Sequence, residues 1–153
     1  MLLRVAAEFQ AFCLDMHELV VDELIRNTAT QNGPLEIILR TALRSTHLSV
    51  GNPTSDKIKK DFARAGVPEI WNLAGSSSVA AKSKLPTLSR LLKVRNAIAH
   101  GQYGEIARNL PARVSVYDFL NSHCVPDLDH IVSELDFALS VFIDGLFGLG
   151  RPW

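Results

Sequence analysis

The chain has 153 residues, a length that suits one domain, expected to cover residues 1–153, with a core large enough to need no disulfide bonds. Sixteen basic and sixteen acidic residues cancel, and the composition excludes collagen-like, disordered and disulfide-rich classes. No apolar run reaches the length of a membrane span, and the first residues lack the layout of a signal peptide. We therefore expect a cytoplasmic protein without membrane contact.

Helical periodicity dominates the first half of the chain. It predicts a helix over about residues 3–26 and a second helix that opens at Pro34 and fades after residues 44–47. The turn Gly51-Asn52-Pro53 precedes a capped helix over residues 56–65, and Pro68 opens a short piece that contains Trp71. A Gly-Ser stretch at residues 75–78 is too short to separate two domains.

Helical periodicity continues in the second half of the chain. A long helix is predicted from about Pro86 to Ala99, with Gly101 as its C-terminal cap, and a last helix over about residues 126–146. Between them, residues 113–117 alternate in polarity and fit a brief strand, a loop or a helical turn equally well. The predicted fold class is an all-α helical bundle.

The neutral overall charge hides a local excess of basic residues. From Val79 to Arg113 the chain carries seven basic residues and one acid, a net charge of +6. Four of the basic residues, Lys82, Lys84, Arg90 and Lys93, are candidates for contacts to an RNA backbone, although a solvated helix face explains them nearly as well.

Arg95 stands out on the predicted helix from Pro86 to Ala99. A helical projection that starts at Leu85 gathers the apolar residues in one arc, and Arg95 falls inside it; the arc comprises Leu85, Leu88, Leu91, Leu92, Ile98 and Ala99. A guanidinium buried without a partner costs several kcal/mol. Arg95 must therefore face an acid, a solvent cleft or a subunit interface. Pairing with Glu18 or Asp22 of the first helix is the structural alternative.

Two further polar residues follow Arg95. Asn96 and His100 are four residues apart, so they are neighbours on one helix face beside Arg95. His100 sits in the last turn, where the helix dipole favours a positive charge. A titratable imidazole, an amide and a permanent cation are the groups needed to deprotonate a ribose 2′-hydroxyl and to neutralise a phosphate without a metal.

The segment Arg95-Asn96-Ala97-Ile98-Ala99-His100-Gly101 resembles the signature of HEPN domains, in which an arginine and a polar residue precede a histidine by a short interval. The order of elements is similar to that of the RiboL-PSP-HEPN group of bacterial proteins. The resemblance implies a bundle with two long antiparallel helices plus shorter helices. It also implies a metal-independent endoribonuclease of the toxin or phage-defence type, with an antitoxin or other partner protein.

Family members dimerise so that their motif helices share one cleft. The resemblance thus assigns Arg95 to the scissile phosphate, His100 to general acid or base catalysis and Asn96 to orientation of the site, in a homodimer without a cofactor. A catalytically inactive HEPN module that binds nucleotide, RNA or a partner protein is the alternative, and a structural protein with a chance motif is a third. His123, Cys124, Asp127 and His130 match no common zinc spacing, so no metal site is expected.

Overall fold

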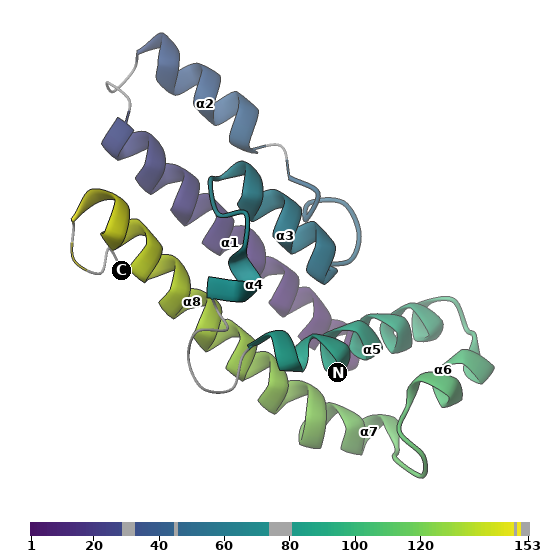
Figure 1. The fold of residues 1–153 in the computed structure, drawn as a ribbon. Helices are drawn as coiled ribbons and strands as arrows, with labels where there is room; N and C mark the ends of the chain where they lie inside the picture. Colours follow the sequence, from purple (N-terminus) through teal and green to yellow (C-terminus); the bar gives the residue numbers. More distant parts are fainter. Residues whose placement is uncertain (29–32, 45, 74–80, 149, 151–153) are drawn as a thin grey trace.

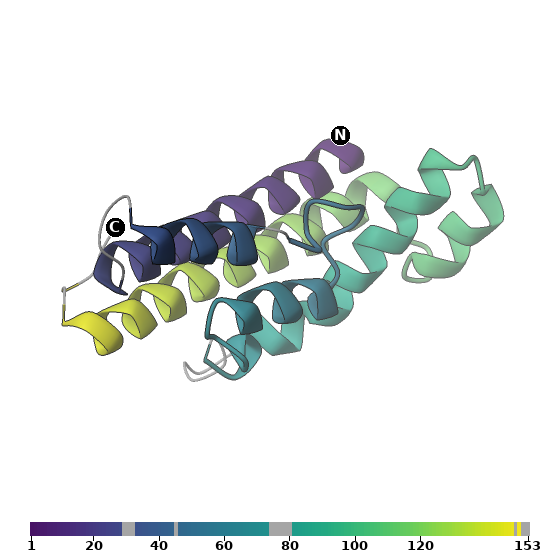
Figure 2. The same ribbon diagram turned by 90° about the horizontal axis from the view of Figure 1, so that it is seen from above.

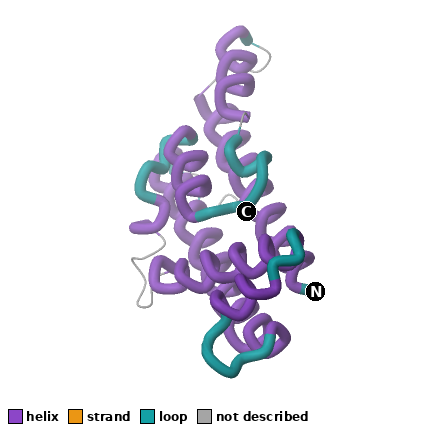
Figure 3. Tube along the Cα trace, turned by 90° about the vertical axis from the view of Figure 1, so that its right-hand side faces the viewer, coloured by secondary structure: helices purple, strands orange, loops and turns teal. Residues whose placement is uncertain are grey.

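In the computed structural model, which describes residues 1–28, 33–44, 46–73, 81–148 and 150, all regular structure is helical (Figure 3). The predicted all-α class is confirmed for these residues, whereas the Gly-Ser stretch at 75–78 lies outside them. The helices are α1 Leu2–Thr28, α2 Pro34–Arg44, α3 Ser55–Arg64, α4 Ile70–Leu73, α5 Ala81–Ala99, α6 Tyr103–Asn109, α7 Val116–Phe119, the π-helix η1 Leu120–Cys124 and α8 Val125–Phe147.

The two longest helices, α1 and α8, run parallel and side by side (Figures 1 and 2). Residues 1–3 lie beside residues 116–120, and residues 5–12 lie beside residues 125–132. The expected antiparallel arrangement of the two long helices is therefore wrong. The reason is that α5 packs against both helices and runs in the opposite direction, so that the reversal between α5 and α8 returns the chain to the direction of α1.

Local sequence explains where several helices begin and end. Thr54 caps α3 by accepting a hydrogen bond from the amide of Lys57, and Gly66 follows the helix with a φ of +86°. In contrast, α5 begins at Ala81, five residues before the predicted start at Pro86. A proline within a helix removes one backbone hydrogen bond. Here Pro86 is exposed, where water can replace the missing donor.

The segment between α5 and α8 folds into further helices. Tyr103–Asn109 forms α6, which packs against α5, and Ser115 caps the short α7 through a hydrogen bond from the amide of Asp118. Residues 113–117 thus form a loop and the start of a helix, and the strand alternative is wrong. From Val116 to Phe147 the chain runs through α7, η1 and α8 without a break.

One hydrophobic core joins these helices. It draws on α1, α3, α4, α5, α7, η1 and α8, and its largest fully buried side chains include Phe62, Phe119 and Leu91. α2 is different, because none of its residues is buried and only Leu39 and Leu43 pack against the core. No helix within the described ranges combines the length and the apolar character needed to cross a membrane.

Candidate functional site

The motif lies where α5 ends. The amide of Gln102 donates to the carbonyl of Ala97 (2.8 Å), and the amide of Gly101 donates to that of Ile98 (3.2 Å). This nested pair is a Schellman motif, and Gly101 adopts the left-handed φ of +66° that such a motif requires. The prediction that Gly101 caps the helix is confirmed. His100 is thereby held at the last position before the turn, with an exposed side chain.

Arg95 is half-buried, and among the described residues no acid comes within ion-pair distance of it. Asp22, the partner proposed in the structural alternative, binds Arg40 of α2 at 2.7 Å instead. The predicted apolar arc also needs correction. Ala99 is exposed and Leu85 and Ile98 are only partly buried, whereas Val94 and Ala97 are buried, because α6 packs against the end of α5. Near the end of α5, the helix face that carries Arg95 is therefore no longer part of the core.

Asn96 joins Arg95 to a loop that is distant in sequence. Its side-chain oxygen Oδ1 accepts a hydrogen bond from Arg95 Nη1 (3.1 Å) and a second from Nδ2 of Asn52 (2.8 Å). Asn52 belongs to the turn before α3 that the sequence marks by glycine and proline. The structure thus adds Asn52 to the candidate site. No sequence signal pairs two asparagines that are 44 residues apart.

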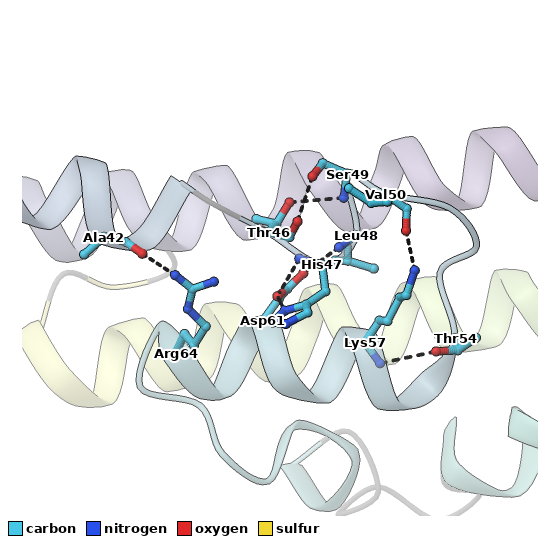
Figure 4. A network of polar contacts seen from close by, with 10 residues as sticks. All are labelled: Ala42, Thr46, His47, Leu48, Ser49, Val50, Thr54, Lys57, Asp61 and Arg64. Atoms are coloured by element: carbon cyan, nitrogen blue, oxygen red, sulfur yellow. Dashed lines mark hydrogen bonds and ion pairs between the residues drawn. The ribbon is translucent and has the colours of Figure 1, made fainter.

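A buried carboxylate anchors the loop that carries Asn52 (Figure 4). Asp61 of α3 has a fully buried side chain that accepts hydrogen bonds from the amides of His47 (2.9 Å) and Leu48 (2.8 Å) and from Nδ1 of the His47 ring (2.7 Å). Burial by itself would raise the pKa of Asp61, but these hydrogen bonds outweigh it and leave the pKa below its usual value. Asp61 is therefore an ionised anchor at neutral pH.

Two further contacts hold the same loop. Gln10 of α1 donates from Nε2 to the carbonyl of Leu48 (2.7 Å), and Lys57 of α3 donates to the carbonyl of Val50 (Figure 4). The loop is fixed from two helices that do not carry the motif. The position of Asn52 consequently depends on α1 and α3, and its side chain binds Asn96 of α5.

Two histidines outside the motif, His47 and His17, have partners in the structure. His47 is half-exposed and bound through Nδ1 to Asp61. His17 is buried with its ring edge against Phe62, at 5.7 Å between ring centroids, and this burial lowers its pKa. Neither partner could be found from the sequence, because an isolated histidine gives no indication of its partner there.

A cavity of about 310 Å³ lies between the start of α3 and α5. Asn52 and Asn96 both line it, together with Asp56, Lys93 and the side chains of leucines 85, 88 and 92. Its wall is apolar along α5 and polar toward α3. Neither Arg95 nor His100 lines the cavity, so that it adjoins the motif without containing it.

The predicted RNA-contacting residues divide into two groups. Lys82, Arg90 and Lys93 are exposed on α5, with Lys93 at the cavity. Lys84 instead forms an ion pair with Asp127 of α8 (2.9 Å), and Thr87 donates to the same carboxylate (2.5 Å). Lys84 therefore joins two helices, and we leave it out of the proposed RNA surface.

The part of the chain that the structure describes contains neither a cluster of metal-ligating side chains nor an exposed cysteine. No group of three or more His, Cys, Asp or Glu side chains gathers there as metal ligands would. Cys13 and Cys124 are buried and unpaired, and burial raises the pKa of the Cys124 thiol to about 12. Both cysteines act as small apolar residues of the core.

With this geometry, the strongest candidate site consists of Arg95, Asn96 and His100 at the end of α5, supported by Asn52. No family model matches the chain, and no match was found among curated proteins or solved structures.

Proposed function

We propose that this chain is a HEPN-type endoribonuclease that cleaves RNA without a metal, as a homodimer. The proposal depends above all on Arg95. This permanent cation lies partly open at the end of α5, and no described acid pairs with it. A guanidinium without an acidic partner is suited to bind an anion that the protein alone does not supply. The phosphate of an RNA chain is such an anion.

In the proposed reaction, His100 removes the proton from a ribose 2′-hydroxyl. The 2′-oxygen then attacks the adjacent phosphorus, and the bond to the 5′-oxygen of the next nucleotide breaks. The leaving 5′-oxygen takes up a proton from water, His100 returns its proton to solvent, and the products are a 2′,3′-cyclic phosphate and a 5′-hydroxyl. Arg95 stabilises the negative charge that develops on the phosphate, and Asn96, held by Asn52, orients the Arg95 guanidinium through its 3.1 Å hydrogen bond.

A second subunit completes this site. Arg95 and His100 are five residues apart, which corresponds to about 140° around a helix, so one chain presents them on different sides of α5. A groove near the end of α5 is lined by apolar residues of α1, α5 and α7, including the exposed Leu3 and Tyr117 and the half-buried Ile98. Exposed apolar surface of this kind favours contact with another chain. We infer that two copies meet here and combine their motifs.

The resemblance to HEPN proteins further suggests the biological setting. The chain would act as the toxin of a toxin–antitoxin pair or as a phage-defence effector, restrained by an antitoxin or other partner protein. Growth arrest of an expressing host, relieved by His100→Ala, is the expected phenotype.

The decisive experiment incubates purified protein with total RNA in EDTA and maps the products. Wild type is expected to cleave, and His100→Ala and Arg95→Ala are each expected to lower the rate by about 10²-fold or more. Matched controls are His123→Ala and Arg108→Ala, which remove the same side chains from exposed positions outside α5 and should leave the rate unchanged. Cleavage that survives either motif substitution contradicts the proposed roles. No cleavage by wild type favours the inactive binding module instead.

The oligomeric state tests the shared cleft separately. Sedimentation equilibrium should give a dimer for wild type, and Ile98→Glu, which places a charge in the apolar groove, should give a monomer without activity. A fully active monomer would rule out the shared cleft.

A further inference from the structure

The cavity between α3 and α5 has a polar corner whose hydrogen-bonding pattern can be worked out from its neighbours. A guanidinium only donates hydrogen bonds, so Asn96 must turn its Oδ1 toward Arg95. Asn52 contacts the same oxygen and must therefore donate from Nδ2. This chain of contacts leaves Asn96 Nδ2 as a donor and Asn52 Oδ1 as an acceptor.

These two atoms have no hydrogen-bond partner among the described residues. They are also not sealed inside the protein, since no fully buried side-chain nitrogen or oxygen in the described part of the chain lacks a partner. Both residues line the cavity. The cavity therefore offers one donor and one acceptor from adjacent amides, in an arrangement fixed by Arg95.

The remaining walls complete a distinctive set of groups. Leu88 and Leu92 provide an apolar surface along α5, Asp56 adds a carboxylate that can accept from an amino group, and Lys93 adds a cation. Nucleobases have apolar faces and an edge that carries a donor next to an acceptor, and proteins read them in single-stranded RNA by contacts of both kinds. A volume of about 310 Å³ lies within the range of small-ligand sites.

We propose that this cavity binds an unstacked base of single-stranded RNA, next to the nucleotide whose phosphate lies at Arg95. The amide pair of Asn52 and Asn96 would contact the edge of the base, the leucines its face, and Lys93 the adjoining phosphate. This inference rests on the proposed function, because the RNA strand that reaches Arg95 is the one that fills the cavity. Asn52 would then be a base-binding residue as well as a positioning residue for Asn96.

The test measures binding in EDTA of hexanucleotides whose 2′-oxygens are methylated, so that they cannot be cleaved. Ser89→Phe fills the cavity from an exposed position on its wall, and Ser83→Phe places the same side chain on an exposed part of α5 outside it. We expect Ser89→Phe to weaken binding of at least one homopolymeric hexamer about tenfold and Ser83→Phe to leave it unchanged. Asn52→Ala, which removes the acceptor, provides a second variant if Ser89→Phe fails to fold.

The four nucleoside 3′-monophosphates form the second arm of the experiment, since a free nucleotide would offer the same base. Hexamers should bind more tightly than monophosphates and displace them. Equal binding by wild type and the folded Ser89→Phe or Asn52→Ala variants overturns the proposal, as does binding of monophosphates that no hexamer displaces. Cavity-dependent hexamer binding without cleavage of total RNA supports the pocket and refutes the ribonuclease. Cleavage of total RNA, together with hexamer binding that does not depend on the cavity, supports the ribonuclease and refutes the pocket.

Discussion

Asp61 links the stability of the fold to the geometry of the candidate site, and its replacement by alanine has a calculable cost. The carboxylate is fully buried and satisfies two backbone amides. The amide of Leu48 is buried, and leaving such a donor unpaired costs about 2–3 kcal/mol, whereas water can reach the partly buried amide of His47 and limit that loss to about 1 kcal/mol. Asp61→Ala should therefore lower the free energy of unfolding by about 3–4 kcal/mol, or Tm by roughly 10 °C.

Urea titrations followed by circular dichroism at pH 7 measure this loss directly. Asp56→Ala is the matched control, because it removes an exposed carboxylate from the first turn of the same helix and should cost at most about 1 kcal/mol through the helix dipole. The pKa of Asp61 is lowered on folding, so its contribution is complete above the unfolded value near pH 4 and is lost as the pH falls through the lower folded pKa. Wild type and Asp61→Ala should therefore approach the same free energy of unfolding in strong acid. A loss at pH 7 no larger than that of Asp56→Ala would refute the assignment of Asp61 as the loop anchor.

Three further predictions concern other parts of the molecule. Burial lowers the pKa of His17, although Asp61 and Glu18 oppose the shift, so the unfolded chain binds a proton at a higher pH than the folded chain does. The free energy of unfolding should therefore fall as the pH drops below about 6.5. His17→Phe should flatten this dependence on pH in urea titrations at pH 5 to 8, and an unchanged dependence would contradict the assignment. Gly101→Ala should cost about 1–2 kcal/mol in thermal melts because its φ is +66°, whereas Gly104→Ala, in α6 with no positive φ, should be neutral or stabilising. Burial raises the pKa of both cysteines, to about 12 for Cys124, so a thiol reagent at pH 8 should label neither in the native protein and both in urea; rapid native labelling would show that the core opens.

The elements that could be predicted are those with a long apolar repeat or a local stop signal. α1 and α8 follow from their periodicity, and the end of α5 follows from Gly101. α6 has only seven residues, too few for the apolar repeat of a longer helix to be recognised, and it was missed. Because α6 was missed, the burial of Ala97 and the exposure of Ala99 near the end of α5 were not predicted, since α6 packs against that end.

The candidate site likewise contains residues that could be predicted from the sequence and residues that could not. Arg95, Asn96 and His100 could be grouped from sequence because they lie within six residues of one helix. Asn52 and Asp61 could not, since their partners are 44 residues and 13 or 14 residues away and polar pairs at such separations leave no periodic trace. Sequence therefore located the candidate reactive groups and left out the residues that orient them.

This division implies that the candidate site depends on parts of the fold outside the motif helix. Asp61 and Lys57 of α3 and Gln10 of α1 hold the loop whose Asn52 contacts Asn96. If that loop shifted, Asn96 would lose one of the two donors on its Oδ1, and the amide that orients the guanidinium of Arg95 would itself be held by one contact fewer. If the proposed function holds, substitutions in α3 should thus impair RNA cleavage while His100 and Arg95 remain in place. The motif alone, grafted onto another helix, would lack this support, because the contact that Asn52 makes with Asn96 comes from the loop before α3.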